Sequence, residues 1–189
     1  MAIGILSVQG AFIEHAHALA DAGARTFEIR QLRDLDRPMD GLVFPGGEST
    51  VQGKLLKDLG LFEPLRARIE AGLPVFATCA GLILLAERLA DDPTTWFGCL
   101  PVTVRRNAYG RQLGSFTTTD TWNGLADVPM TFIRAPAITQ VSPGVDVLSS
   151  FGGQATSVRW RNLLAFAWHP ELTTDRRAYA VFLDMCARR

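Results

Sequence analysis

The chain has neither an excess of one charge nor a framework of cysteines. Lysine plus arginine and aspartate plus glutamate each number 19, so the 189 residues carry no net charge. No long basic run occurs, which argues against nucleic acid as a main partner. There are only three cysteines, and neither a CxxC nor an HExxH pattern occurs. We therefore expect free thiols and no dedicated metal site.

Long hydrophobic runs are also missing, although 48% of the residues are hydrophobic. No apolar stretch is long enough to span a bilayer, and the N-terminus lacks the basic, apolar and cleavage regions of a signal peptide. Together with free thiols, these absences predict a cytoplasmic protein without a membrane partner. Repeats and interdomain linkers are absent too, so residues 1–189 are expected to form a single domain with a sizeable core.

The first half of the chain alternates short apolar runs with longer amphipathic ones. Such alternation predicts an α/β fold with a mostly parallel central sheet and helices on both faces. The expected strands cover residues 3–8, 26–29, 41–44 and 75–78. The expected helices begin at residue 12, at residue 49 or 50, and at residue 62, and a further helix follows Cys79 and continues through 82–89.

Short runs separated by turn residues fill the second half and predict short, partly antiparallel strands. They cover residues 102–104, 112–119, 131–133, 137–141, 145–150 and 155–160. A last strand is expected at 163–168, followed by a helix that Thr173, Thr174 or Asp175 can cap. His15 and His17 lie two apart on the first helix and point to different faces, so we expect solvated side chains rather than joint ligands.

Cys79 stands where a buried strand turns sharply into a helix, followed by the small residues Ala80 and Gly81. The turn exposes the side chain and places it at a helix N-terminus, where free N–H groups and the helix dipole favour a thiolate. This is the arrangement of a nucleophile elbow with sulfur in place of a serine hydroxyl. A buried structural cysteine is the alternative, because free cysteine is among the most buried residue types.

His169 and Glu171 supply a base and an orienting acid for such a thiolate. Residues two apart in an extended segment point to the same side, and Pro170 biases His169 away from helical geometry. An amide from Gly46 or Gly47, at another strand end, can join the N–H of Ala80 in an oxyanion hole. The residues alone thus predict a cysteine hydrolase acting on a carbonyl substrate.

Several short motifs are spread over nearly the whole chain. They are VQGA at 8–11, PGGEST at 45–50, TCAGL at 78–82, RN at 106–107 with GRQ at 110–112, FIRAP at 132–136, and HPELT at 169–173. Together they resemble the motifs of the class I glutamine amidotransferases, and within them those of the glutaminase subunits of pyridoxal 5′-phosphate synthases. The glycine- and arginine-containing segments are the most specific part of this resemblance.

The resemblance implies a flavodoxin-like fold and hydrolysis of L-glutamine through a thioester on Cys79, with His169 and Glu171 completing the catalytic triad. It also implies that the oxyanion is held by Gly47 and Ala80, and that no cofactor is needed. Ammonia would pass to a (β/α)₈-barrel synthase subunit, with Gln9 coupling that partner to the oxyanion hole. The implied glutamine-binding residues are Gly46, Gly47, Glu48, Ser49, Arg106, Ile133 and Arg134.

Four positions depart from the family pattern. Tyr179 stands where a histidine is usual, Trp168 where a phenylalanine is common, and Ser7 and Val8 replace commoner residues in the first strand. None of these removes a catalytic group. The alternatives are a glutaminase subunit serving a different acceptor synthase, a related cysteine hydrolase such as a peptidase or deglycase, and a regulatory binding module with a degenerate site.

Overall fold

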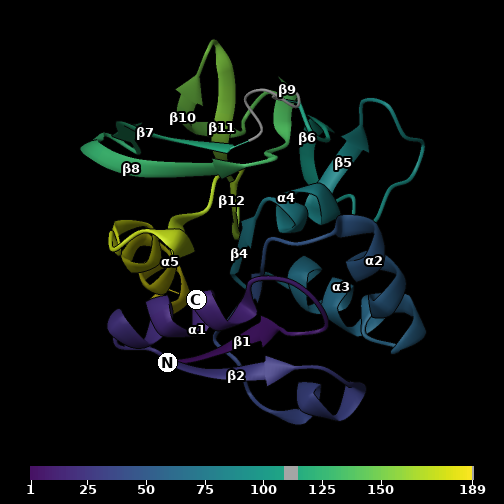
Figure 1. The fold of residues 1–189 in the computed structure, drawn as a ribbon. Coiled ribbons are helices and arrows are strands. Elements are labelled where there is room, and N and C mark those ends of the chain that lie inside the picture. Colours follow the sequence, from purple (N-terminus) through teal and green to yellow (C-terminus); the bar gives the residue numbers. More distant parts are fainter. Residues whose placement is uncertain (109–114, 189) are drawn as a thin grey trace.

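The computed structural model describes residues 1–108 and 115–188, and a large β-sheet lies at its centre (Figure 1). Five neighbouring strands of this sheet run parallel, which confirms the parallel core expected from the sequence. In spatial order they are β2 (Arg25–Ile29), β1 (Ala2–Leu6), β3 (Gly41–Phe44), β4 (Val75–Thr78) and β12 (Leu163–Phe166).

Beyond β12 the sheet continues through antiparallel pairs. The next strands are β11 (Gln154–Trp160), β9 (Ala137–Val141) and β6 (Leu100–Arg105), with β10 (Asp146–Phe151) paired to β11. A separate antiparallel pair is formed by β7 (Ser115–Trp122) and β8 (Leu125–Ile133). The short antiparallel strands expected in the second half are therefore present, and residues 112–114 of one of them lie outside the described residues.

Helices cover both faces of the parallel strands (Figure 1). One face carries α1 (Phe12–Asp21) and α5 (Arg177–Ala187), and the other carries α2 (Ser49–Asp58), α3 (Phe62–Glu70) and α4 (Ala80–Leu85). Two 3₁₀ turns are also present, η1 (Leu32–Asp36) and η2 (Pro170–Leu172). Within the described ranges, no helix is both long and apolar enough to cross a membrane.

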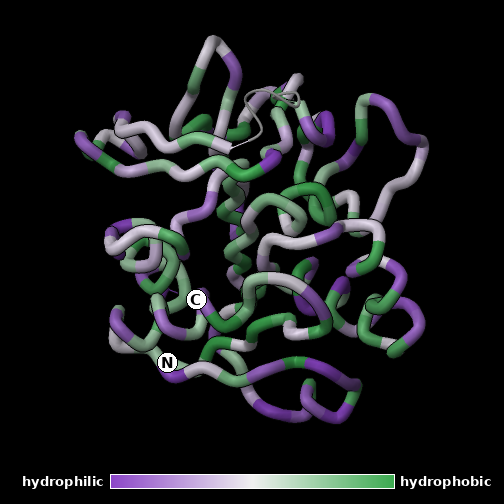
Figure 2. The backbone as a smooth tube through the Cα atoms, in the orientation of Figure 1, coloured by the Kyte–Doolittle hydropathy of each residue, from purple (hydrophilic) through white to green (hydrophobic). Residues whose placement is uncertain are grey.

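The two apolar layers use alternate residues of the same strands. On β4, Val75 and Ala77 belong to the cluster that includes α2 and α3, whereas Phe76 belongs to the cluster of α1 and α5 and stacks on Tyr179. Because both faces are covered, a central strand is buried throughout and reads as a continuous apolar run. Figure 2 shows hydrophobic segments along these inner strands and hydrophilic ones at the outer turns.

Residues 86–89, expected to continue the helix after Cys79, instead form the strand β5 (Ala86–Leu89). The helix α4 ends at Leu85, and the carbonyl of Leu84 accepts a hydrogen bond from the backbone N–H of Phe97 at 3.0 Å. β5 pairs in parallel with β6. The expectation was wrong because Ala86 to Leu89 are good helix formers, but such a propensity is weak, and here a neighbouring strand offers hydrogen bonds that override it.

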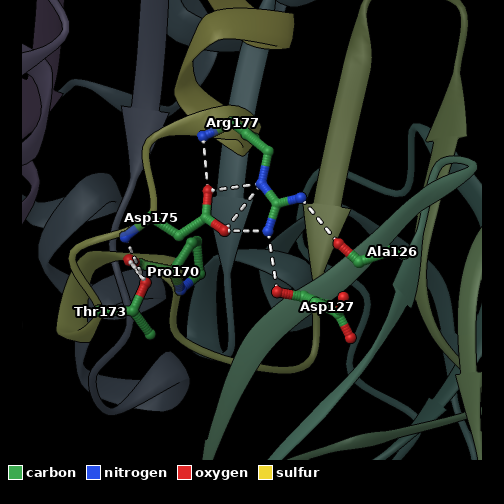
Figure 3. Close-up of polar contacts among 6 residues, drawn as sticks. All are labelled: Ala126, Asp127, Pro170, Thr173, Asp175 and Arg177. Atoms are coloured by element: carbon green, nitrogen blue, oxygen red, sulfur yellow. Dashed lines mark hydrogen bonds and ion pairs between the residues drawn. The ribbon is translucent and has the colours of Figure 1, made fainter.

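The β7–β8 pair is fastened to the start of α5 by one arginine (Figure 3). The guanidinium of Arg177 donates to the carbonyls of Ala126 and Asp127, at 2.8 and 2.9 Å. Asp175 pairs with the same guanidinium and also accepts the backbone N–H of Arg177 at 2.9 Å. Among the three residues expected to cap this helix, Asp175 therefore satisfies a free amide at its start.

Candidate active site

A cavity of about 450 Å³ lies where the parallel strands end. The segments that follow β1, β3, β4 and β12 all reach its wall, as is usual for ligand sites of open α/β sheets. Ala80 and Glu171 are buried beside it. The other site residues expected from the sequence line the cavity directly: Gln9, Gly46, Gly47, Glu48, Ser49, Cys79, Arg106, Ile133, Arg134 and His169.

Cys79 joins β4 to α4 in a strained backbone conformation. Its φ is +48° and its ψ is −99°, which a residue with a Cβ rarely adopts outside functional sites. The Cys79 N–H donates to the carbonyl of Phe166 on β12 at 2.8 Å, which fixes the turn against the neighbouring strand. At Gly81, a Cβ would lie 2.3 Å from the carbonyl oxygen of Phe44, so only glycine allows the helix to start this close to β3.

His169 follows β12 and is held by its backbone and by its ring. Its N–H donates to the carbonyl of Thr131 on β8 at 2.8 Å. Its ring Nδ1 lies 2.6 Å from Oε1 of Glu171, which sits in the turn η2 that begins at Pro170. Gly46 lies against the other side of the ring: a Cβ there would meet Cε1 of His169 at 2.6 Å and Cβ of Cys79 at 3.5 Å.

The pair of His169 and Glu171 is held in its charged form. Burial opposes a charge on the imidazole, but the proximity of Cys79 and the hydrogen bond to Glu171 outweigh it and raise the pKa of His169 to about 10. Burial would likewise raise the pKa of Glu171, but its contacts with His15 and His169 lower it below its usual range. A protonated imidazole beside a sulfur nucleophile is the arrangement that acyl transfer by cysteine needs.

The turns after β1 and β3 are tied together beside Cys79. The carbonyl of Gly46 accepts the N–H of Ala11 at 3.0 Å, and the side-chain oxygen of Gln9 accepts the N–H of Glu48 at 2.9 Å. A Cβ at Gly47 would lie 2.5 Å from that same Gln9 oxygen. The conformation of the Gly46–Gly47 peptide, which lies beside Cys79, is therefore set by contacts with the turn after β1.

Two arginines also line the cavity. Arg106 donates to the hydroxyl of Thr50 at 3.0 Å and forms an ion pair with Asp92. Arg134 is exposed at the end of β8, with a φ of +42° that again marks backbone strain. Residues 110–112, which complete the RN…GRQ motif, lie outside the described residues. In the part of the chain that is described, no group of three or more His, Cys, Asp and Glu side chains could hold a metal ion.

His15 was expected to be solvated, and that expectation was wrong. Its side chain is fully buried, and its ring nitrogens contact Tyr179 and Thr78. His17, two residues on, is exposed as expected. The sequence held the signal, because His15 stands three residues after Phe12 and four before Leu19, on the apolar side of the helix.

Comparison with known proteins agrees with this geometry. The chain is 55% identical over 184 residues to "Pyridoxal 5′-phosphate synthase subunit PdxT" of Desulfitobacterium hafniense (strain Y51), with 97% of this chain and 92% of that protein covered. It is 46% identical over 192 residues to the protein of the same name from Streptococcus pneumoniae (strain ATCC 700669 / Spain 23F-1), with both chains covered completely.

Solved structures give the same result. A crystal structure described as a glutamine amidotransferase superposes with a TM-score of 0.92 at 39% identity, covering 98% of each chain. The structure of PurLQS from Thermotoga maritima superposes with a TM-score of 0.70 at 13% identity, covering 97% of each chain, which supports the fold alone. Residues 5–188 match the model of the SNO glutamine amidotransferase family, and the chain belongs to that family.

Proposed function

We propose that this chain is a glutaminase that hydrolyses L-glutamine to L-glutamate and ammonia and supplies the ammonia to a pyridoxal 5′-phosphate synthase subunit. The observation that carries the proposal is the strained Cys79 turn in one cavity with the hydrogen-bonded pair of His169 and Glu171. Full-length relatives named as subunits of that synthase support the choice of acceptor. In this proposal residues 1–189 act as one cytoplasmic glutaminase domain.

In the first half of the reaction, the Cys79 thiolate attacks the side-chain amide carbon of glutamine. The carbonyl π electrons move to oxygen, which becomes the oxyanion of a tetrahedral intermediate. The imidazolium of His169 then gives its proton to the amide nitrogen, the C–N bond breaks, and ammonia leaves with a thioester on Cys79. The raised pKa of His169 keeps that proton available near neutral pH.

In the second half, water replaces ammonia. The neutral His169 takes a proton from the water as its oxygen attacks the thioester carbon. The C–S bond of the second tetrahedral intermediate breaks, glutamate leaves, and the pair of thiolate and imidazolium is restored. Glu171 accepts the Nδ1–H of His169 throughout, which keeps Nε2 as the nitrogen that carries the mobile proton.

The oxyanion of each intermediate is assigned to the backbone amides of Ala80 and Gly47. The N–H of Ala80 belongs to the first residue of α4 and is one of the free amides of that helix end. The amide of Gly47 depends on the turn beside it, because Gln9 packs against Gly47 and accepts the N–H of Glu48. A partner that moves Gln9 would therefore change the oxyanion hole, so we propose a glutaminase that is weak alone and activated by its synthase subunit.

The arginine side of the cavity suits the α-carboxylate of glutamine. Guanidinium groups bind carboxylates through paired hydrogen bonds, and Arg106 and Arg134 both line this wall. Gly46, Glu48, Ser49 and Ile133 would shape the rest of the pocket. Pyridoxal 5′-phosphate is then a product of the complex and not a cofactor of this chain, and the proposed partner is a (β/α)₈-barrel subunit that accepts ammonia.

The test measures glutamate release from glutamine, with and without the synthase subunit, for the wild type, Cys79→Ala and Cys99→Ala. Cys99 is the matched control, because burial raises the pKa of its thiol to about 11 and it lies outside the cavity. We expect release that rises with the partner, disappears in Cys79→Ala and persists in Cys99→Ala. A wild type that releases no glutamate in either condition would favour a different cysteine hydrolase or a binding module.

A further inference from the structure

Behind Glu171, three buried side chains from distant parts of the chain form a polar cluster. His15 comes from α1, Thr78 from the end of β4 and Tyr179 from α5, and all three are 0% exposed. The ring Nδ1 of His15 lies 2.9 Å from the Tyr179 hydroxyl, and its Nε2 lies 3.1 Å from the Thr78 hydroxyl. Burying this many polar groups is costly, so such a cluster calls for an explanation beyond packing.

The cluster touches the proposed triad at one atom. Nε2 of His15 lies 3.6 Å from Oε1 of Glu171, and the same oxygen lies 2.6 Å from Nδ1 of His169. Oε2 of Glu171 is buried and has no hydrogen-bond partner among the described residues. The rings of His15 and His169 therefore both approach Oε1 of Glu171. The contact with His15 helps to keep this oxygen, and not Oε2, turned toward His169.

The contacts also select one tautomer of His15. Burial lowers the pKa of His15, so the ring is neutral and carries a single N–H. Burial raises the pKa of Tyr179 well above its usual value, so its hydroxyl keeps its proton. With Glu171 ionised, the arrangement of lowest energy has the Tyr179 hydroxyl donating to Nδ1, and the Nε2–H directed at Thr78 and Glu171.

We propose that His15 is a positioning residue for the acid of the triad, and that Tyr179 fixes the tautomer His15 needs for this role. His15 presents an N–H dipole to Oε1 of Glu171 without carrying a charge that would compete with His169. Thr78 completes the arrangement and directly precedes Cys79 in the chain. The cluster therefore adjoins the proposed triad at Cys79 and contacts it at Glu171. This inference rests on the proposed use of Cys79, His169 and Glu171 in catalysis.

The surroundings of His15 define what a variant would disturb. The ionisable groups that face it are Glu171 and His169 across the site, Tyr179 on α5 and Glu14 on its own helix. Its ring also meets the edge of Phe76 at a centroid distance of 5.9 Å, so a purely structural role would appear as lost packing. The test therefore needs readouts that packing alone would not move.

Four variants of the full chain separate the two roles. His15→Leu keeps an apolar side chain and removes both nitrogens, whereas His15→Gln keeps a donor that reaches toward Glu171. Tyr179→Phe removes only the hydroxyl that fixes the tautomer. His17→Gln is the matched control, because His17 is exposed on the same helix.

Two readouts need neither glutamine nor a partner. The first is the rate at which iodoacetamide alkylates Cys79, followed by mass spectrometry of its peptide across a range of pH. The second is the NMR titration of the His169 ring, whose midpoint we expect near pH 10 in the wild type. Glutamate release in the presence of the synthase subunit and thermal unfolding are measured beside them. A failure of the glutaminase proposal thus leaves the first two readouts intact.

We expect alkylation of Cys79 near neutral pH to slow by about tenfold in His15→Leu, the size expected for losing one polar contact to a buried charged group. The His169 midpoint should fall by about one unit. His15→Gln should recover most of both effects, Tyr179→Phe should lie between, and His17→Gln should match the wild type. The proposal is overturned if His15→Leu leaves both readouts unchanged, or if His15→Gln is as impaired as His15→Leu.

Discussion

Nδ1 of His169 lies 2.6 Å from Oε1 of Glu171, and both side chains are almost completely buried. A buried carboxylate and imidazole at this distance stabilise each other's charge, since little water is present to screen them. The pKa of His169 is raised from 6.5 to about 10, so its contribution to stability is fully present below pH 6.5 and is lost as the pH rises through about 10.

Glu171→Gln removes the charge and keeps the shape. Without the carboxylate, the pKa of His169 should fall by at least about one unit, because a charge-assisted hydrogen bond becomes a neutral one. The titration of the His169 Cε1 proton by NMR measures this midpoint directly. Glu63→Gln, an exposed position on α3, serves as the control and should leave the midpoint in place. An unchanged midpoint in Glu171→Gln would contradict the assigned pairing.

Gly46→Ala tests how closely the His169 ring is held. The added Cβ would meet Cε1 of His169 at 2.6 Å, so the ring must shift away from Cys79. We expect glutamate release to drop by about a hundredfold, because a displacement near 1 Å is enough for a loss of this size.

Gly23→Ala is the matched control for Gly46→Ala. It adds a Cβ where nothing lies within 4 Å, but at a φ of +83° that alanine adopts poorly. Thermal unfolding should show Gly23→Ala to be less stable than the wild type, with normal activity at low temperature. Full activity in Gly46→Ala would contradict the close packing of Gly46 against the His169 ring.

Asp92→Asn tests whether the ion pair with Arg106 orients that guanidinium over the cavity. The loss of the negative charge should free Arg106 to turn toward solvent, since among the described residues only the Thr50 hydroxyl then accepts a hydrogen bond from it. We expect the KM for glutamine to rise by about tenfold with little change in kcat, as for a contact made equally in the ground state and the transition state. Steady-state kinetics with the synthase subunit present measure both constants.

The neighbouring pair offers a close comparison. Asp91 pairs with Arg105 at 3.3 Å, is largely exposed and does not line the cavity. Asp91→Asn should therefore leave KM near the wild-type value. Equal rises in KM for Asp91→Asn and Asp92→Asn would show that a change in the segment around residues 91–92, and not the orientation of Arg106, causes the effect.

Arg177→Met tests the fastening of the β7–β8 pair, whose strand β8 also holds the backbone of His169 through Thr131. Loss of the two bonds to the carbonyls of Ala126 and Asp127 should let this pair open more often. We expect its amides to exchange with solvent about tenfold faster, measured by hydrogen–deuterium exchange. Arg159→Met removes an exposed ion pair with Asp146 and should change little. Equal protection in both variants would contradict the role of Arg177.

The placement of the main site followed from local patterns in the sequence. Buried parallel strands read as continuous apolar runs, and the residues just after them, Gln9, Gly46, Cys79 and His169, meet at one edge because parallel strands end together. The strand β5 did not follow, because residues 86–89 are good helix formers and only the pairing with β6 overrides that weak propensity.

Apart from the strand β5, the sequence by itself determined the order of the main strands and helices, the turn at Cys79 and the spacing of His169 and Glu171, since each depends on residues close together in the chain. Only the tertiary structure decided the surroundings of those residues. The hydrogen bond between His15 and Tyr179, which are 164 positions apart in the chain, and the pairing of Arg106 with Asp92 each join separate elements. Such contacts depend on how helices pack on the sheet, and no periodicity within one element encodes them.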